Sequence, residues 1–529
     1  MLIDLLSRGY FPKELPAPFN TRSFASAIST AATLPADFGK KHGNKIASAH
    51  LGRYSLARGG LFRRPLSICS PLHYFHLCKE LSDEWSLISP KVTGTGISAT
   101  YPELKATGRA INGKHSQGDR SRLAQSARLG RRYLLQTDIS RFYNSIYTHS
   151  IPWALHGKSV AKANRLDTLV GNRIDRLVRQ GQDQQTVGIP IGPDTSLVLA
   201  ELLMHRCDEA LLAKVPNAQG HRFIDDYELS FSTRTEAEDA FHVLESCLAH
   251  FELALNPKKT RVVELPTPLE AGWARSLKRF AIKESLSGQA ADLEYYFSLA
   301  FELHKATDPD EAVLQFALAR LRSLKIRAEN WENLQKLMLL CVAPEPASFP
   351  YVLQLVVQQK NAGAPILTGA FEEVVNNLIV EHSELQHSSE VANALWACLA
   401  LRLNLSSAAV AAVGACDDPV VALLALDCRA NGLASSALDT TLWSSHMTPG
   451  GLYGPHWLLS YEAAVKGWLP SAKGGDHVAA DQNFGFLKAS NVSFYDVALA
   501  SPTPMGPIPT PVVPTPTPTP LPSSFSSIA

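Results

Sequence analysis

The sequence predicts an α+β protein whose three parts differ in residue pattern. Up to about residue 285, runs of β-branched and aromatic residues show strand-like alternation. Beyond that point Leu, Ala and Val recur at helical spacing, as in residues 292–321 and 371–381, and Pro and Gly separate the helical runs. Residues 501–529 are rich in Pro and Thr instead. We therefore expect a mixed part, a stacked α-helical part and a tail without regular structure.

Two short acidic segments lie 87 residues apart in the mixed part. In residues 133–143 a run of aliphatic and aromatic residues reaches Asp138, and residues 222–231 contain Asp225 and Asp226. Such runs are typical of strands, so each segment presents carboxylates at or near a strand end. Strand-like residues stand on both sides of the second acidic pair, which predicts a hairpin with Asp225 and Asp226 at its bend.

An Asp-Asp pair more commonly lies in a solvated turn. Asp417 and Asp418 offer a comparison within the chain, because they precede a proline and an apolar run and so predict a helix N-terminus. The catalytic interpretation is favoured at Asp225 because Asp138 stands in a second, matching context. Three carboxylates brought together would hold two divalent ions about 3.5–4 Å apart, which activate a 3′-hydroxyl and stabilise a leaving pyrophosphate. Mg²⁺ suits such a site, with Mn²⁺ as the alternative.

Four segments, in order within about 125 residues, resemble the palm motifs of reverse transcriptases. They are residues 137–143, 188–196, 223–226 and 253–260. The resemblance implies a right-hand polymerase palm preceded by fingers, and an RNA-directed DNA polymerase that makes DNA from dNTPs. It also implies that Asp138 and Asp225 bind the metal ions directly, while Asp226 sits beside the metals and supports the primer end.

The same resemblance suggests further site residues. Tyr143 falls at the position of a steric gate against a ribose 2′-hydroxyl, with simple core packing as the alternative. Lys259 is expected to donate a proton to the leaving pyrophosphate, with Lys258 as the alternative donor. Gly188 and Pro190 belong to the segment that packs under the nascent base pair and the template. Gly and Pro there also fit an ordinary turn.

One position departs from the family pattern. Many templated reverse transcriptases carry a Gln directly before the Gly that begins the motif at residues 188–196, whereas this chain has Val187. Gln184 and Gln185 lie slightly upstream. The loss of that polar contact puts ordinary template handling in doubt and leaves the chemistry intact.

A net charge of +1 hides a basic cluster that precedes Asp138. Eight basic residues lie between positions 101 and 132, opposed by Glu103 and Asp119. We expect this cluster to contact the triphosphate and the phosphate backbone, with Arg131 and Arg132 as the named candidates, and a solvated surface is the alternative. The cluster comprises Lys105, Arg109, Lys114, Arg120, Arg122, Arg128, Arg131 and Arg132. An earlier group comprises Lys40, Lys41, Lys45, Arg53, Arg58, Arg63 and Arg64.

Segments outside the palm, at residues 8–19, 65–74, 142–158 and 457–468, resemble bacterial abortive-infection (AbiK-like) and defence-associated reverse transcriptases. Members of that group extend DNA without an ordinary template or copy a noncoding RNA, and some prime from a protein tyrosine. The resemblance implies antiphage defence, a homo-oligomer, a DNA product and a noncoding RNA as one candidate template. Tyr10 and Tyr461 are candidate priming residues. The alternatives are a conventional RNA-templated reverse transcriptase of retron or intron type, and a catalytically silent nucleic-acid-binding scaffold.

We expect an N-terminal segment with fingers (1–135), a palm (136–285), a HEAT-like α-helical repeat domain (286–500) and a disordered Pro/Thr-rich tail (501–529). The composition, 45% hydrophobic and 19% charged, is ordinary for a globular protein. No apolar run reaches membrane-spanning length, and the eight cysteines are scattered. We therefore expect a cytoplasmic enzyme with reduced core thiols and no membrane partner. Core positions, with base stacking as the alternative, are expected for Trp443, Trp457, Trp468, Phe494 and Tyr495.

Overall fold

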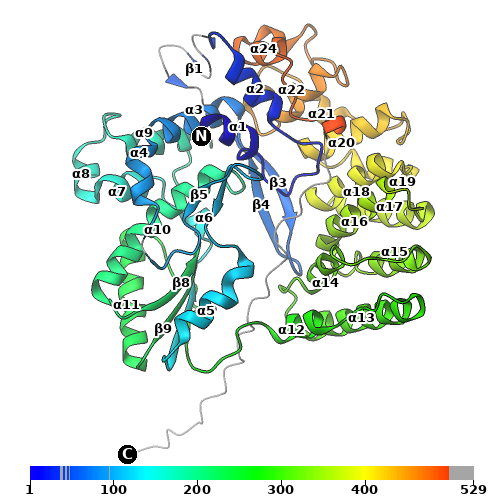
Figure 1. Cartoon of the computed structure of the whole chain (residues 1–529). Helices are drawn as coiled ribbons and strands as arrows, with labels where there is room; N and C mark the ends of the chain where they lie inside the picture. Colours follow the sequence, from blue (N-terminus) through cyan, green and yellow to red (C-terminus); the bar gives the residue numbers. More distant parts are fainter. Residues whose placement is uncertain (36–37, 39, 42–44, 47, 95, 500–529) are drawn as a thin grey trace, which may run out of the picture.

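The computed structural model describes residues 1–499 except residues 36–37, 39, 42–44, 47 and 95. The Pro/Thr-rich tail, predicted to be disordered from residue 501, lies outside the described residues. Figure 1 shows a mixed part around a small sheet on one side and a series of helices on the other. The described part is therefore α+β, as the sequence predicted.

The sheet that carries both acidic segments has four antiparallel strands in the order β10-β7-β9-β8. The bounds are Tyr133–Asp138 for β7, Gln219–Phe223 for β8, Asp226–Phe231 for β9 and Arg261–Glu264 for β10. Helix α11 (Arg234–His250) packs on β7 and β9 and contacts α10 (Asp194–Lys214). Leu134 and Leu135 of β7 and Leu229 of β9 are fully buried. Apolar burial therefore holds the two central strands in place, and their acidic residues lie at one end of them.

Helices and two short hairpins precede and interrupt this sheet. The hairpin β3–β4 pairs Gly52 with Ile68 and Ala57 with Arg63, and it forms the finger-like projection between the two sides in Figure 1. The first elements are α1 (Leu2–Arg8), α2 (Arg22–Thr30), β1 (Lys40–Lys41), β2 (Lys45–Ile46), β3 (Gly52–Ala57), β4 (Arg63–Ile68), α3 (Pro71–Asp83) and α4 (Trp85–Ile88). The next are β5 (Pro102–Leu104), β6 (Ile111–Gly113), α5 (Arg120–Arg128), α6 (Phe142–Ser145), α7 (Ser150–His156), α8 (Lys158–Ala163) and α9 (Val170–Gln180).

The second half of the described chain is helical. Neighbouring helices pack on one another, among them α13 on α14, α15 on α16 and α17 on α18 (Figure 1). The bounds are α12 (Gly272–Arg279), α13 (Leu286–Ala306), α14 (Val313–Leu321), α15 (Trp331–Leu339), α16 (Phe349–Asn361), α17 (Thr368–Ser383) and α18 (Ser388–Leu401). The series continues with α19 (Ser407–Val413), α20 (Pro419–Ala430), α21 (Thr441–Ser444), α22 (Trp457–Val465), α23 (His477–Ala480) and α24 (Gln482–Ala489).

Two details of this half bear on the sequence predictions. The helical run predicted over residues 292–321 is broken between α13 and α14, because Pro309 has no N–H and the Asp308 side chain accepts the Asp310 N–H at 3.0 Å. Asp418 caps the N-terminus of α20, where its carboxylate accepts the N–H groups of Val420 and Val421. The helix N-terminus predicted at that acidic pair is confirmed.

The helical half docks directly on the β3–β4 hairpin. The N–H of Ser55 donates to Ser388 Oγ at 3.0 Å, and the N–H of Ala57 donates to Ser389 Oγ at 2.9 Å. Arg63 donates to both carboxylate oxygens of Glu390. The N-terminus of α18 therefore satisfies backbone donors on an outer edge of the hairpin, which would otherwise be exposed.

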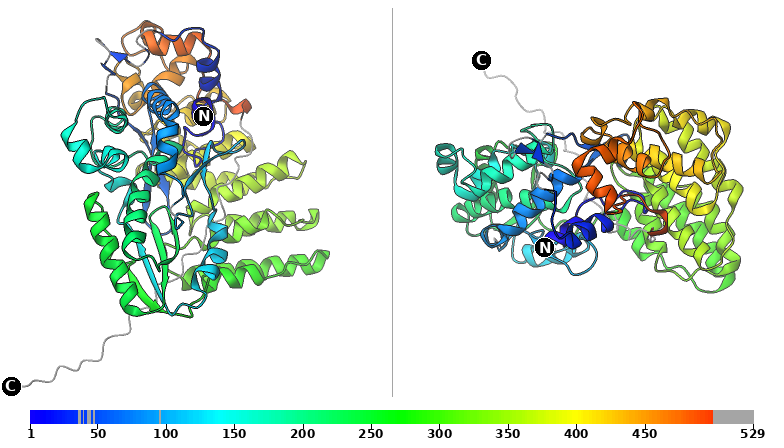
Figure 2. Two further views of the ribbon diagram at one scale, coloured as in Figure 1. Left: turned by 60° about the vertical axis from the view of Figure 1, so that its left-hand side comes forward. Right: turned by 90° about the horizontal axis from the view of Figure 1, so that it is seen from above.

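The two ends of the described chain are interlocked. Figure 2 shows the N-terminal helices beside the last helices of the described chain. The N–H of Asn20 donates to the Phe494 carbonyl at 3.0 Å, and Trp457 Nε1 donates to the Ile68 carbonyl at 3.2 Å. One continuous apolar core includes residues from both sides of position 286. Side chains from the two sides of the predicted domain boundary at that position therefore pack together in one core.

The predicted core aromatics are buried, because Trp443, Trp457, Phe494 and Tyr495 are at most 1% exposed and Trp468 packs partly buried against the same core. All eight cysteines are free, and all but the half-buried Cys247 are buried. Among the described residues, no helix is both long and apolar enough to cross a membrane.

Candidate active site

The two acidic segments meet at one end of β7 and β9. The register places Asp138 opposite Asp226, and the N–H of Ile139 donates to the Asp225 carbonyl at 3.2 Å. Asp225 lies in the bend between β8 and β9, next to Ile224, whose φ of 59° is unusual for a β-branched residue. The predicted hairpin with acids at its bend is therefore present, and it brings the three carboxylates together.

The charge of this cluster is unfavourable without a cation. Burial raises the pKa of the Asp225 carboxyl to about 7, and the neighbouring charges of Asp138 and Asp226 add to the rise. Several carboxylates that face one another fit a divalent cation, whose charge offsets their repulsion. The donors are oxygens only, which is the donor set that Mg²⁺ prefers. The residues present therefore fit a magnesium site.

The fourth motif lies beside Asp138. Lys259 Nζ is 3.0 Å from Asp138 Oδ2, and Asn256 Nδ2 donates to Asp138 Oδ1 at 3.2 Å. Thr260 Oγ1 and Thr137 Oγ1 are 2.7 Å apart, where the chain enters β10 along the edge of β7. Of the two candidate lysines, Lys259 is thus the one whose ammonium reaches the carboxylate cluster.

Asp226 has a cationic partner of its own. Arg120 of α5 donates from Nη2 to Asp226 Oδ2 at 2.6 Å, and its guanidinium lies over the Phe223 ring at 4.9 Å from the centroid. The sequence grouped Arg120 with seven other basic residues and gave no reason to single it out. The ion pair leaves Asp138 and Asp225 as the carboxylates without an arginine partner in the cluster.

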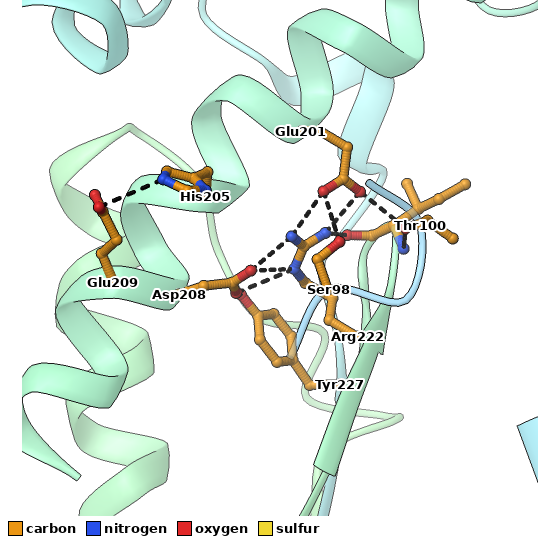
Figure 3. A network of polar contacts seen from close by, with 9 residues as sticks. Ser98, Thr100, Glu201, His205, Asp208, Glu209, Arg222 and Tyr227 are labelled. Atoms are coloured by element: carbon orange, nitrogen blue, oxygen red, sulfur yellow. Dashed lines mark hydrogen bonds and ion pairs between the residues drawn. The ribbon is translucent and has the colours of Figure 1, made fainter. Parts of the chain in front are cut away.

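A fully buried arginine supports the bend from behind (Figure 3). Arg222, 0% exposed, donates to Glu201 at 2.9 Å and to Asp208 at 2.7 Å, and its Nη1 donates to the Ile224 carbonyl at 2.7 Å. Tyr227 completes the network by donating its hydroxyl to Asp208 at 2.7 Å. The network connects α10 with both strands of the hairpin and so fixes the residue that precedes Asp225.

A second support comes from the chain before α5. The N–H of Ile224 donates to Thr100 Oγ1 at 2.8 Å, and that hydroxyl donates to Glu201 at 2.8 Å. The strained bend is thus held through both its N–H and its carbonyl. No sequence signal identified these partners, because they lie more than a hundred residues from the bend or on another element.

The first and second motifs also pack together. Tyr143 lies on α6, a helix that begins directly after Arg141, and Arg141 adopts a φ of 47°. The N–H of Ile189 donates to the Tyr143 carbonyl at 2.9 Å, and the N–H of Gly188 donates to the Ile146 carbonyl at 2.8 Å. Gly188 has a φ of 89°, which favours glycine at this contact. Burial, and then the charge of Asp225, raise the pKa of the Tyr143 hydroxyl well above its usual value, so the ring lies close to the carboxylate cluster.

The residues in and just before the second motif divide between surface and core. Val187 is 61% exposed and, with Gln185 and Gly188, lines a cleft of about 630 Å³ beside the β3–β4 hairpin. The Gln182 amide is used within the turn, where it donates to the carbonyls of Gln185 and Gly188. Pro190, predicted to contact substrate, is buried, and its carbonyl accepts the Ser196 hydroxyl. Pro190 therefore shapes the loop from within.

The basic cluster before Asp138 is largely paired. Six of its eight members have carboxylate partners: Lys105 and Lys114 with Glu103, Arg109 with Asp194, Arg120 with Asp226, Arg122 with Asp119 and Arg128 with Glu228. Arg131 donates to Gln219 and Ser232 at the far end of the sheet. Arg131 and Arg132 precede β7, so its length of about 20 Å separates them from Asp138. Both arginines therefore lie at the end of β7 opposite the carboxylate cluster, and this placement does not favour the predicted contact with the triphosphate.

Two arginines of the β3–β4 hairpin lie nearer to the carboxylate cluster than Arg131 and Arg132 do. Arg64 of β4 lies close enough to Asp225 for the charge of that carboxylate to act on its guanidinium. Arg58, at the tip, lines a cleft of about 1190 Å³ together with Asp226 and Lys259. The sequence analysis placed both arginines in the earlier basic group and did not single them out as site residues. The side chains of Lys40, Lys41 and Lys45 from that group lie outside the described residues.

The larger cleft separates the sheet from the helical half. Its lining includes Arg120 of α5, Trp273 of α12, Phe316 and Arg320 of α14, and Asp308 of the loop before α14. At the hairpin tip, the backbone of Gly59 closely approaches that loop, since a side chain added there would meet the Pro309 carbonyl. Asp226 of the carboxylate cluster thus lines a cleft bounded by the sheet, the β3–β4 hairpin and the first stacked helices.

A small antiparallel sheet with clustered carboxylates at a hairpin bend, covered by two helices, defines a polymerase palm. The comparison with known families makes the class specific. Residues 96–286 match the family model described as reverse transcriptase (RNA-dependent DNA polymerase). The chain therefore contains a reverse transcriptase domain and is an RNA-directed DNA polymerase. No curated protein matches the chain.

The two candidate priming tyrosines do not reach this site. Tyr10 is buried and donates its hydroxyl to the Cys69 carbonyl at 2.6 Å. Tyr461 is buried and donates to the Val492 carbonyl at 2.8 Å. In this structure both hydroxyls form hydrogen bonds inside the core.

Proposed function

We propose that the reverse transcriptase domain makes DNA from dNTPs by metal-dependent nucleotidyl transfer, with Asp138 and Asp225 as metal ligands. The observation that carries this proposal is the meeting of three carboxylates at one end of β7 and β9, where burial and the charges of Asp138 and Asp226 raise the pKa of Asp225. Bound Mg²⁺, or Mn²⁺ in its place, would activate a 3′-hydroxyl and stabilise the leaving pyrophosphate.

The surrounding side chains support this chemistry. Arg120 holds Asp226 beside the proposed metal ligands. Lys259 is 54% exposed on its side chain, so it can leave Asp138 and follow the departing pyrophosphate as a proton donor. Arg58 and Arg64 are proposed to contact the triphosphate, in place of Arg131 and Arg132.

We also propose that Tyr143 selects deoxynucleotides. Its ring lies near Asp225 and Arg64, and a bulky ring at that point would collide with a ribose 2′-hydroxyl. Replacement of Tyr143 by Ala is expected to raise incorporation of rNTPs relative to dNTPs, measured with each nucleotide set on the same primer. An unchanged ratio would assign Tyr143 to core packing.

The central test replaces Asp225 and Asp226 together by Asn. We expect dNTP incorporation to be lost while the circular dichroism spectrum is retained, because Asn keeps the shape but loses the charge that binds metal. Asp239→Asn, on the exposed face of α11, is the matched control and should keep full activity. Synthesis by the double variant at the wild-type rate would contradict the proposal.

For the biological role we propose antiphage defence, with synthesis that is protein-primed and template-independent or that copies a noncoding RNA. Two features support a departure from ordinary templating: Val187 is exposed in the smaller cleft where many templated enzymes carry Gln, and the segments resembling defence enzymes extend to both ends of the described chain. Gln185 lines the same cleft, which keeps the alternative open: a conventional RNA-templated enzyme of retron or intron type.

We further propose that the helical half from α13 onward forms the HEAT-like repeat domain expected over residues 286–500, which replaces a thumb and guides nucleic acid along the larger cleft. Pairwise packing of neighbouring helices supports this proposal. We also propose that the protein is cytoplasmic and forms a homo-oligomer. Size-exclusion chromatography with light scattering tests the oligomeric state.

Sequencing of the nucleic acid that copurifies with the protein decides between the modes of synthesis. One half of the sample is treated with protease first, and nuclease digestion separates DNA from RNA. Repetitive or random DNA that partitions with protein until digestion supports protein-primed, template-independent synthesis. A defined RNA with complementary DNA supports copying, and a DNA free of protein then favours the conventional alternative.

A further inference from the structure

A second cluster of metal-ligating side chains lies outside the palm, at the edge of the smaller cleft. Asp417 directly precedes the cap of α20, and His446 and His456 lie on either side of a short turn at Gly451–Tyr453. One ligand atom from each of the three residues lies within 4.8 Å of the other two. Nε2 of His446 is 2.9 Å from Asp417 Oδ1, and Nε2 of His456 is 3.4 Å from the same oxygen.

His456 is not satisfied by the protein alone. The residue is 8% exposed, and among the described residues its Nδ1 has no hydrogen-bond partner. Its Nε2 lies 3.4 Å from Asp417, beyond the usual length of an N–H···O bond. A buried imidazole with neither nitrogen well paired is unfavourable, and each such group in a native structure calls for an explanation, of which a bound ion is one.

The separations suit a tetrahedral ion. Zinc bonds to nitrogen and oxygen of about 2.0–2.1 Å at tetrahedral angles place neighbouring ligand atoms about 3.3 Å apart. The two distances to Asp417 Oδ1 lie on either side of that value. The imidazole rings stack with centroids 3.8 Å apart and 12° between their planes. One ion cannot accept the in-plane lone pairs of two stacked rings, so the more exposed His446 ring must turn out of the stack when the ion binds.

We propose that Asp417, His446 and His456 form a binding site for a divalent transition-metal ion of the zinc class. Two imidazoles and one carboxylate favour zinc, whereas Mg²⁺ prefers oxygen ligands throughout. Three protein ligands leave a fourth position, and Asp417 and His456 both line the cleft that contains Val187. The ion joins the start of α20 to the loop before α22 and so stiffens one wall of that cleft.

The chain contains a matched comparison. His382, His387 and Glu390 also bring their ligand atoms within 4.8 Å of one another. There, however, Glu390 already accepts both guanidinium donors of Arg63 and the Ser389 hydroxyl. A cation would have to compete with that arginine for the carboxylate. This second cluster therefore serves as the control.

The test uses the full chain, stripped with a chelator and then titrated with Zn²⁺ in excess Mg²⁺, which occupies the palm carboxylates. Elemental analysis after gel filtration gives the stoichiometry, and Co²⁺ substitution reports the ligand geometry through its visible absorption. We expect one tightly bound equivalent in the wild type, an intense tetrahedral Co²⁺ band, and a rise in melting temperature on binding. His446→Ala, His456→Ala and Asp417→Asn should each weaken binding by at least about tenfold. His387→Ala should leave it unchanged.

Three results would overturn the proposal. They are a wild type that takes up no zinc in excess Mg²⁺, a His446→Ala variant that retains full zinc affinity, and an equal loss in the His387→Ala control. If His456→Ala fails to fold, His446→Ala carries the test, because that ring is less buried and its removal leaves a smaller cavity. Circular dichroism of each variant distinguishes lost metal from lost fold.

Discussion

Asp225 is the residue on which the charge balance of the palm depends. Burial and two neighbouring carboxylates raise its pKa to about 7, from 3.8 in an unfolded chain. Between these two pH values the folded state holds a proton that the unfolded state has released. The stability of the metal-free protein should therefore fall as pH rises from about 4 to 7, by about 1 kcal/mol per pH unit, and should level off above 7.

The corresponding measurement is a series of melting curves at pH 5, 6, 7 and 8 with and without Mg²⁺. Because the ion binds the ionised carboxylate, its stabilising effect should grow with pH up to about 7 and then remain constant. Asp225→Asn, which cannot ionise, should flatten both profiles. A Mg²⁺ effect of equal size at every pH would show that Asp225 is not a ligand.

Lys259 and Lys258 form a matched pair for the proton-donor role. Only the first has its ammonium placed on the carboxylate cluster, 3.0 Å from Asp138. Lys259→Ala is expected to lower the single-turnover rate of dNTP incorporation by about a hundredfold, with little change in stability because the ion pair is half exposed. Lys258→Ala should keep the wild-type rate. Equal losses in the two variants would point to general charge neutralisation instead.

At the scale of elements, the β8–β9 hairpin owes its position to the buried network around Arg222. Lysine cannot serve Glu201 and Asp208 at once, so Arg222→Lys should destabilise the fold by about 3–5 kcal/mol. Tyr227→Phe removes only the hydroxyl bond to Asp208 and should cost about 1–2 kcal/mol. Denaturant unfolding measures both changes.

Activity measurements distinguish a positioning role of the Arg222 network from a purely stabilising one. If the network positions the bend, Tyr227→Phe should lower the rate of incorporation at a temperature where the protein remains folded. Arg131→Gln is the control: its side-chain hydrogen bonds at the other end of the sheet are exposed, so the change should alter stability by less than about 0.5 kcal/mol. A Tyr227→Phe variant with the full wild-type rate would limit the network to a structural role.

At the scale of the whole molecule, the helical half and the β3–β4 hairpin share one interface. Ser388 and Ser389 accept the N–H groups of Ser55 and Ala57. Replacement of both serines by Ala should leave those N–H groups without acceptors, so their hydrogen exchange should accelerate by more than about tenfold. Ser407→Ala, near the start of α19, is the control. Unchanged exchange at Ser55 and Ala57 would mean that the hairpin holds its position without the helical half.

Local residue patterns predicted much of the palm and one helix start outside it. The strand ending at Asp138, the hairpin at Asp225 and the helix start at Asp418 were all predicted from neighbouring residues. Local patterns did not predict long-range geometry: Arg131 and Arg132 stand next to the motif in sequence but lie at the opposite end of β7. Pro190 belongs to a motif yet is buried, because side-chain exposure depends on what packs over the loop.

The sequence by itself determined the chemical class, because carboxylates at strand ends and their order along the chain are local features of the residue pattern. Only the tertiary structure decided which arginine holds Asp226, which arginines approach Asp225, and how the last helices lock onto the first. Those contacts join residues that are tens to hundreds of positions apart. Their partners follow from how the elements pack around one core, and no spacing along the chain encodes that arrangement.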